Sequence, residues 1–182
     1  MSGIISQSRL GQYDVLKPDD NYLGTVRKFM DKDWSVPDGV ALRSGCWITA
    51  VYVKNDSGGE LTKSLGVKFK DTALGLSLGG LSGADGRCDG VIDPFLPGTG
   101  LPNGSYGWII VSGPCDVVIG TSGVSQGEAI QTAASGKFIA LTDGNTYASG
   151  RAGIANAAIS QDATGRVWLN LAYQALIPGF CA

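Results

Sequence analysis

The chain has 182 residues, of which 43 % are hydrophobic and only 16 % are charged, and its formal net charge is −2. An average soluble domain has about 25 % charged residues, so a surface this poor in charge favours an oligomer or an assembly subunit. No basic block is present, so we expect no nucleic-acid partner. The absence of histidine removes the commonest general base and metal ligand. We therefore expect no enzyme, no cofactor and no metal site.

Residues 1–38 are predicted to form an extended N-terminal arm that precedes a β-rich domain over residues 39–182. Short apolar stretches alternate there with charges, and Pro18 and Pro37 interrupt any helix. Aromatic residues spaced along such an arm are typical of anchors on a partner surface. The alternative is that the arm packs back against its own domain. The candidate partner-binding residues are Tyr13, Tyr22, Phe29 and Trp34.

From residue 40 the sequence changes to short β-branched and aromatic runs. Residues 40–42 and 47–53 predict strand, residues 55–59 read Asn-Asp-Ser-Gly-Gly and predict a turn, and residues 65–70 alternate apolar with basic side chains. These segments together predict a hairpin over residues 40–70. Residues 73–81 alternate leucine with small residues, which fits either a strand or an irregular segment. The loops at 82–87 and 95–104 leave open a division into two lobes, 39–104 and 105–182.

The second half of the chain repeats short strands with glycine turns between them. Ser112-Gly113-Pro114 is predicted to separate two strands, and Ser135-Gly136 predicts a turn. Residues 152–159 favour a strand over a short helix. Close, regular spacing of this kind predicts an all-β fold, a small β-barrel or β-sandwich. The predicted strands are 106–111, 115–119, 128–132, 137–141 and 166–171.

Several motifs of the second half occur in an order that resembles a known family. They read YGWIIVSGP from residue 106, VSQGEAI from 124, GKF from 136, GRAGIANAA from 150 and GRVWLNL from 165. Over roughly residues 105–172, this order resembles the capsid cement and head-decoration proteins of tailed bacteriophages. The resemblance implies a structural virion protein, commonly a homotrimer, that binds the outer capsid surface and stabilises contacts between major capsid proteins. It also implies synthesis in the host cytoplasm.

A cement role is physically consistent with the composition. A protein that binds a repeated lattice gains affinity from many linked contacts, and it stabilises the shell because it binds only the assembled form. The alternative is a carbohydrate- or receptor-binding module like a head fibre. In that case Trp47, Trp108 and Trp168 would form a sugar-binding face, whereas their positions within strands favour core packing.

Two carboxylate sites are weaker candidates. Asp85, Asp89 and Asp93 lie four residues apart in a glycine-rich stretch, but they miss the ligand spacing of a calcium loop, so solvated loop acids are favoured. Asp116 with Glu128 is the candidate pair of a carboxylate-based hydrolase, against ordinary surface placement.

The cysteines and the N-terminus bear on the compartment. We expect the cysteines to be reduced, although four separated positions leave disulfide pairing open. The first residues lack the pattern of a signal peptide, and no apolar run approaches the roughly 20 residues of a membrane span, so we expect no membrane association. The four cysteines are Cys46, Cys88, Cys115 and Cys181.

Overall fold

The computed structural model describes residues 9–15, 23–35, 42–71, 75–83, 87–141 and 151–171. These residues form twelve strands and one 3₁₀ turn, η1 (Ala134–Gly136), so the predicted all-β class is confirmed. Within them no helix is long and apolar enough to cross a membrane. The strands are β1 (Val26–Lys32), β2 (Leu42–Asn55), β3 (Leu61–Thr62), β4 (Gly66–Asp71), β5 (Gly75–Leu81), β6 (Gly90–Ile92), β7 (Gly100–Leu101), β8 (Tyr106–Val118), β9 (Ala129–Thr132), β10 (Phe138–Ala140), β11 (Arg151–Ala155) and β12 (Thr164–Asn170).

Five strands close into a ring. The sheet order runs β2-β5-β4-β6-β8, and a further ladder between β2 and β8 joins the two ends. The β2–β5 contact is parallel and the other four are antiparallel. Of the two predicted architectures, this part of the molecule is therefore a small barrel-like ring and not a sandwich. Closure removes the free sheet edges that invite aggregation.

The interior of this first ring is filled by alternate residues of its strands. Val51 and Val53 of β2 face Ile109 and Val111 of β8 within one buried cluster. The small sheet of β3 and β7 adds Leu61 and Leu101 to the same cluster, through the pairing of these two leucines. The remaining buried members are Val67, Phe69, Leu78, Ile92 and Leu96.

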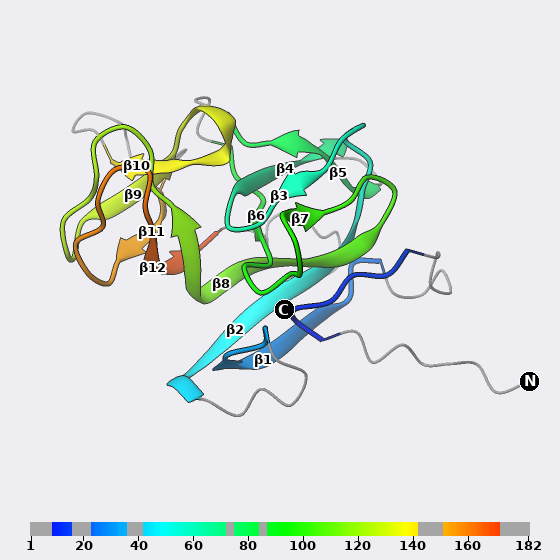
Figure 1. The fold of residues 1–182 in the computed structure, drawn as a ribbon, viewed down its shortest axis with the longest axis horizontal. Coiled ribbons are helices and arrows are strands. Elements are labelled where there is room, and N and C mark those ends of the chain that lie inside the picture. The colour runs from blue at the N-terminus through cyan, green and yellow to red at the C-terminus, as the bar shows by residue number, and fades with distance from the viewer. Residues whose placement is uncertain are drawn as a thin grey trace, which may run out of the picture.

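The second half of β8 begins a second, nearly closed arrangement. The order continues β8-β12-β11-β9-β10, and a parallel bridge between Phe138 and Ile119 returns the sheet to the end of β8. The N–H of Gly120 donates to the carbonyl of Phe138 at 2.6 Å. Figure 1 shows β9–β12 to the left of β8 and β4–β6 to its right. The larger hydrophobic cluster extends from this second ring under β2 and β8.

β8 is one continuous strand, which corrects the predicted break at residues 112–114. Residues 106–110 pair with β2, and residues 112–118 pair with β12. The β2 register shifts between Thr49 and Ala50, so Val111 is an extra residue on β8. Gly113 lies just beyond it with φ +97°, and a Cβ there would lie 2.2 Å from the carbonyl oxygen of Trp47. The breaker residues therefore bend β8 at a β-bulge without ending it.

In its described residues, the predicted arm packs back against the domain, which is one of the two alternatives given for it. β1 pairs antiparallel with β2 from Val26 opposite Val51 to Lys32 opposite Leu42. Leu10 is fully buried in the larger cluster. Asp14 exchanges two backbone hydrogen bonds of 2.8 Å with Tyr106 at the start of β8. Apolar burial outweighed the local signals from proline and charge, so this segment packs back on the domain.

The predicted hairpin over residues 40–70 is also wrong. β5 lies between β2 and β4, so these two strands do not pair. The turn at Asn55 is present, with the side-chain oxygen of Asn55 accepting from the N–H of Ser57 at 3.1 Å. After the turn the chain forms β3, which pairs with β7. Residues 75–81 form a strand, as one of the two alternatives for this segment had it.

Gly113 provides a direct test of the bend. We expect Gly113→Ala to lower the free energy of unfolding by well over the roughly 1–3 kcal/mol of a positive φ alone, because the new Cβ also meets the Trp47 carbonyl. Gly58→Ala is the matched control, since Gly58 has φ +88° with nothing within 4 Å of its Cβ. Urea denaturation measures both variants. Equal losses in the two would contradict a steric role for Gly113.

Candidate functional site

The three tryptophans of the proposed sugar face have different environments. Trp108 is 1 % exposed and belongs to the core, as the core-packing interpretation held. Its ring contacts Tyr52 and Phe29 edge-on, with centroid separations of 5.0 and 5.1 Å. Trp47 and Trp168 are 55 % and 43 % exposed. Core packing is therefore wrong for these two residues, and a face that includes Trp108 is excluded.

Trp47 and Trp168 lie on the same face of the sheet, on either side of β8. Ile48, next to Trp47, and Val167 and Leu169, around Trp168, point into the larger core cluster. Because side chains alternate along a strand, both tryptophans point away from that cluster. The Trp47 backbone lies against Gly113, and Trp168 pairs with Pro114.

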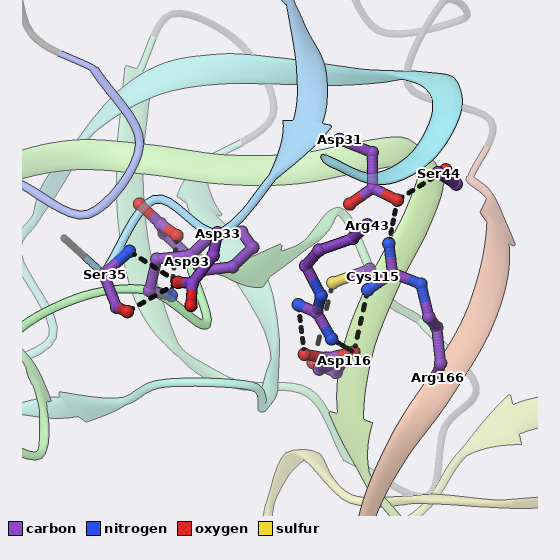
Figure 2. A network of polar contacts seen from close by, with 10 residues as sticks. Asp31, Asp33, Ser35, Arg43, Ser44, Asp93, Cys115, Asp116 and Arg166 are labelled. Atoms are coloured by element: carbon purple, nitrogen blue, oxygen red, sulfur yellow. Dashed lines mark hydrogen bonds and ion pairs between the residues drawn. The ribbon is translucent and has the colours of Figure 1, made fainter. Parts of the chain in front are cut away.

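A network of arginine and aspartate side chains lies next to Trp168. Arg166 of β12 is opposite Asp116 of β8, and its Nη1 donates to the Asp116 carboxylate at 3.3 Å. Arg43 of β2 donates to both oxygens of Asp116, at 2.7 and 3.2 Å. The other terminal nitrogen of Arg166 donates to Asp31 of β1. Figure 2 shows Arg166 extending between the two carboxylates.

Asp31 is the most deeply placed member of this network. Its side chain has no exposed surface. One carboxylate oxygen accepts from Arg166 and from the hydroxyl of Ser44 at 2.5 Å, and the other has no hydrogen-bond partner. Asp31 lies at a bulge, because Met30 is opposite Trp47 while Lys32 is opposite Leu42. A buried carboxylate with so few donors depends on its cation for compensation.

Two of the three aspartates of the candidate calcium loop are buried and have separate partners. Asp89 accepts from the N–H of Phe69 at 2.8 Å and pairs with Arg87. Asp93 has no exposed surface and accepts from the N–H groups of Gly11 and Phe95, at 2.6 and 2.9 Å. The solvated placement is therefore wrong for this pair, while Asp85 lies outside the described residues. No group of three or more potential ligands occurs among the described residues.

Burial raises the pKa of Asp93 to about 7, while the hydrogen bonds from Gly11 and Phe95 and the nearby charge of Lys63 act in the opposite direction. Asp93 connects the N-terminal segment to the loop after β6. Gly11 is held tightly at this junction, since a Cβ there would lie 2.2 Å from the carbonyl oxygen of Trp34.

The candidate hydrolase carboxylates have different partners. Asp116 is held by Arg43 and Arg166, as described above. Glu128 accepts from the N–H of Ser125 at 2.7 Å, in the turn before β9. Glu128 also borders an open hollow of about 530 Å³ whose lining does not include Asp116. The other polar residues of that lining are Ser122, Ser125 and Ser160.

The four candidate anchors are placed as follows. Phe29 and Trp34 are half-buried against the larger cluster, with ring centroids 5.8 Å apart, and Tyr13 packs against the smaller one. Tyr22 lies outside the described residues. Packing within the chain thus accounts for the three described aromatics, and their contact with a partner stays a prediction.

The described cysteines are free thiols at Cys46, Cys88 and Cys115. Desolvation raises the pKa of the Cys88 thiol to about 12 and that of Cys115 well above its usual value. These two groups are therefore uncharged thiols at neutral pH and weak nucleophiles. Cys181 lies outside the described residues.

No pattern in the sequence marked Asp31, Arg43 or Arg166 as site residues. Residues 166–170 did contain a signal for part of the sheet face that carries Trp168, because Arg166, Trp168 and Asn170 alternate with two apolar residues. Strict alternation of this kind predicts one buried and one solvent-facing side.

Comparisons with known proteins include a remote likeness among solved structures. No protein-family model matches the chain, and no curated protein matches it. Among solved structures, the chain is similar to the N base of the head fibre protein gp8.5 of bacteriophage phi29, with 13 % identity and a TM-score of 0.46. The match covers 68 % of this chain and 94 % of that one. A likeness this distant carries no argument about function.

The buried ion pair gives a test of the network. We expect Arg166→Met to lower the free energy of unfolding by roughly 3–5 kcal/mol, because it leaves the Asp31 carboxylate buried without its cation. Adding Asp31→Asn should restore part of this loss. Lys137→Met is the control, because Lys137 and Asp162 form an exposed pair, 2.6 Å apart, and solvent screening makes such a pair contribute far less to stability. Urea denaturation would contradict the assignment if the two single variants lost the same amount.

Asp93 gives a test by pH. A carboxyl whose pKa is raised on folding binds its proton more tightly in the native state, so its contribution to stability falls as pH rises from about 4 through 7. Relative to Asp93→Asn, the native chain should lose up to about 1.4 kcal/mol per pH unit in this range. Asp162→Asn is the control: its pKa is lowered, chiefly by the hydrogen bond from Lys137, so its profile should parallel the native one above pH 5. Parallel profiles for Asp93→Asn from pH 5 to 8, measured by urea denaturation, would argue against a raised pKa.

Proposed function

We propose that this protein is a structural component of a phage head that binds the outer capsid surface and stabilises contacts between major capsid proteins. The observation that carries the proposal is the set of large apolar side chains left exposed on a surface of low charge. Val15 is 72 % exposed and Leu42 is 61 % exposed, in addition to the two tryptophans. Apolar side chains that water reaches in the free chain gain free energy when a partner surface buries them.

The order of motifs over residues 105–172 supports the same proposal. These motifs supply the continuous β8 and strands of the second ring. The role needs no catalytic chemistry. In this proposal the protein belongs to the virion, is made in the host cytoplasm, and forms a homotrimer whose partner is the major capsid protein.

Quantitative mass spectrometry on purified particles tests the location. We expect a copy number near that of the major capsid protein, or a simple fraction of it set by the icosahedral lattice. A few copies per particle would indicate a fibre or a receptor binder in place of a cement protein. Absence from the particle would overturn the virion assignment altogether.

Sedimentation with capsid shells that lack the protein tests the surface. We expect Val15→Asp and Leu42→Asp to weaken co-sedimentation, because each places a charge where an apolar side chain would be buried on docking. Thr62→Asp is the matched control, since it adds the same charge at an exposed polar position of β3. Shell binding that is equal in all variants would count against apolar docking.

Light scattering should give the mass of a trimer for the native chain.

A further inference from the structure

We propose that the sheet face carrying Trp47 and Trp168 is a binding site for a neutral oligosaccharide. The indole side chains of Trp47 and Trp168 project from β2 and β12, with one strand, β8, between them. Adjacent strands lie about 4.8 Å apart, so the two backbones are separated by roughly 10 Å at this point. Pro114 of β8, opposite Trp168, has a short side chain without a polar group and is itself buried. The exposed apolar surface of this face therefore comes from the two indole rings, with no polar side chain between them.

Hydrogen-bonding side chains lie along one side of this aromatic row. Ser112 of β8 is opposite both Thr49 of β2 and Asn170 of β12, so the three residues form the next row across the same strands. Each is two residues from its neighbour in the aromatic row, and therefore points to the same face. Thr49 and Ser112 are partly exposed, and Asn170 is exposed. Hydroxyl and amide groups both donate and accept hydrogen bonds.

The arginine–aspartate network forms the row on the other side. Asp116 and Arg166 are opposite each other, two residues from Pro114 and Trp168. Their side chains are 20 % and 22 % exposed, and that of Arg43 is 31 % exposed. Mutual hydrogen bonds hold these groups in place before a ligand arrives, which lowers the entropy that binding must offset.

This order of rows matches the surface of a sugar. A pyranose ring has a flat face of C–H groups, which stacks on an indole, and a rim of hydroxyls, which needs both donors and acceptors. The face offers indole rings in its central row and donors and acceptors in both flanking rows. A protein partner would also bury the tryptophans, but each polar group of the flanking rows would then need its own donor or acceptor on the partner. The hydroxyls of a sugar rotate and can act as donor or acceptor, so a sugar needs no such individual match.

The charge balance of the network favours an uncharged ligand. Two arginines and two aspartates, Arg43, Arg166, Asp31 and Asp116, pair among themselves. Their formal charges cancel, so this side of the face has no excess charge to attract an anionic or a cationic polymer. The inference does not depend on capsid association.

Isothermal titration of the full chain tests the site in solution. The probes are four neutral hexasaccharides: cellohexaose, xylohexaose, maltohexaose and chitohexaose. We expect at least one to bind, and both Trp47→Ala and Trp168→Ala to weaken its affinity tenfold or more. Asn170→Ala should weaken it less. Val15→Ala should leave it unchanged, because Val15 is exposed and apolar but follows the bridge at the opposite end of β8.

The possible outcomes distinguish a sugar-binding site from a misfolded variant and from a protein-binding face. Circular dichroism should show that the variants fold, since both tryptophans are exposed. Failure of all four saccharides to bind at millimolar concentration would overturn the proposal, as would binding that survives the double substitution. Loss of shell co-sedimentation in the double variant, without saccharide binding by the native chain, would assign the face to a protein partner instead. Saccharide binding by a chain that is absent from particles would support this inference and overturn the virion assignment.

Discussion

The continuity of β8 through residues 112–114 is the constraint on which the fold depends. The first part of this strand closes one ring against β2 and β6, and the second part opens the other ring against β12. If the strand ended at Ser112, the continuous ladder that joins the two rings through β8 would be lost. The bulge at Val111 and the left-handed conformation of Gly113 bend β8 at this point and let one strand serve both rings.

The same bend exposes the tryptophan face. Within the first ring, Val51 and Ile109 are buried among ring residues. Thr49 precedes Val51 by two residues on β2 and lies beyond the closed part of the first ring. Trp47 precedes Thr49 by two more residues, so its side chain lies on the same face of the sheet as those of Thr49 and Val51. The face of the sheet that is interior in one half of the molecule thus becomes exterior in the other. An exposed Trp47 is a consequence of where the ring stops, and its position next to Trp168 follows from the pairing of both strands with β8.

The sequence predicted the fold class and most strands, because glycine turns and β-branched runs are local signals. Residues 166–171, for example, correspond to β12 within two residues at each end. It did not predict which tryptophan is buried. Trp108, Ile109 and Ile110 are all buried because cores lie on both sides of that part of β8, so alternation gives no information there. The pairing of Asp31 with Arg166 joins residues 135 apart in sequence, which no local pattern predicts. β1 was misjudged because its charges suggested solvent, whereas Asp31 is buried through its pairing with Arg166.

The closure of the first ring sets the order in which the chain can fold during synthesis. β2 has three neighbours: β1 precedes it in sequence, β5 follows it closely, and β8 begins only at Tyr106. Translation adds about 5–20 residues per second, so β2 waits seconds for the strand that completes its ladder. During that time Val51 and Val53, which end inside the ring, have no β8 partner to cover them. The nascent chain therefore exposes the apolar half of β2 before it can fold, and a chaperone that binds extended apolar segments would find its target in residues 47–53.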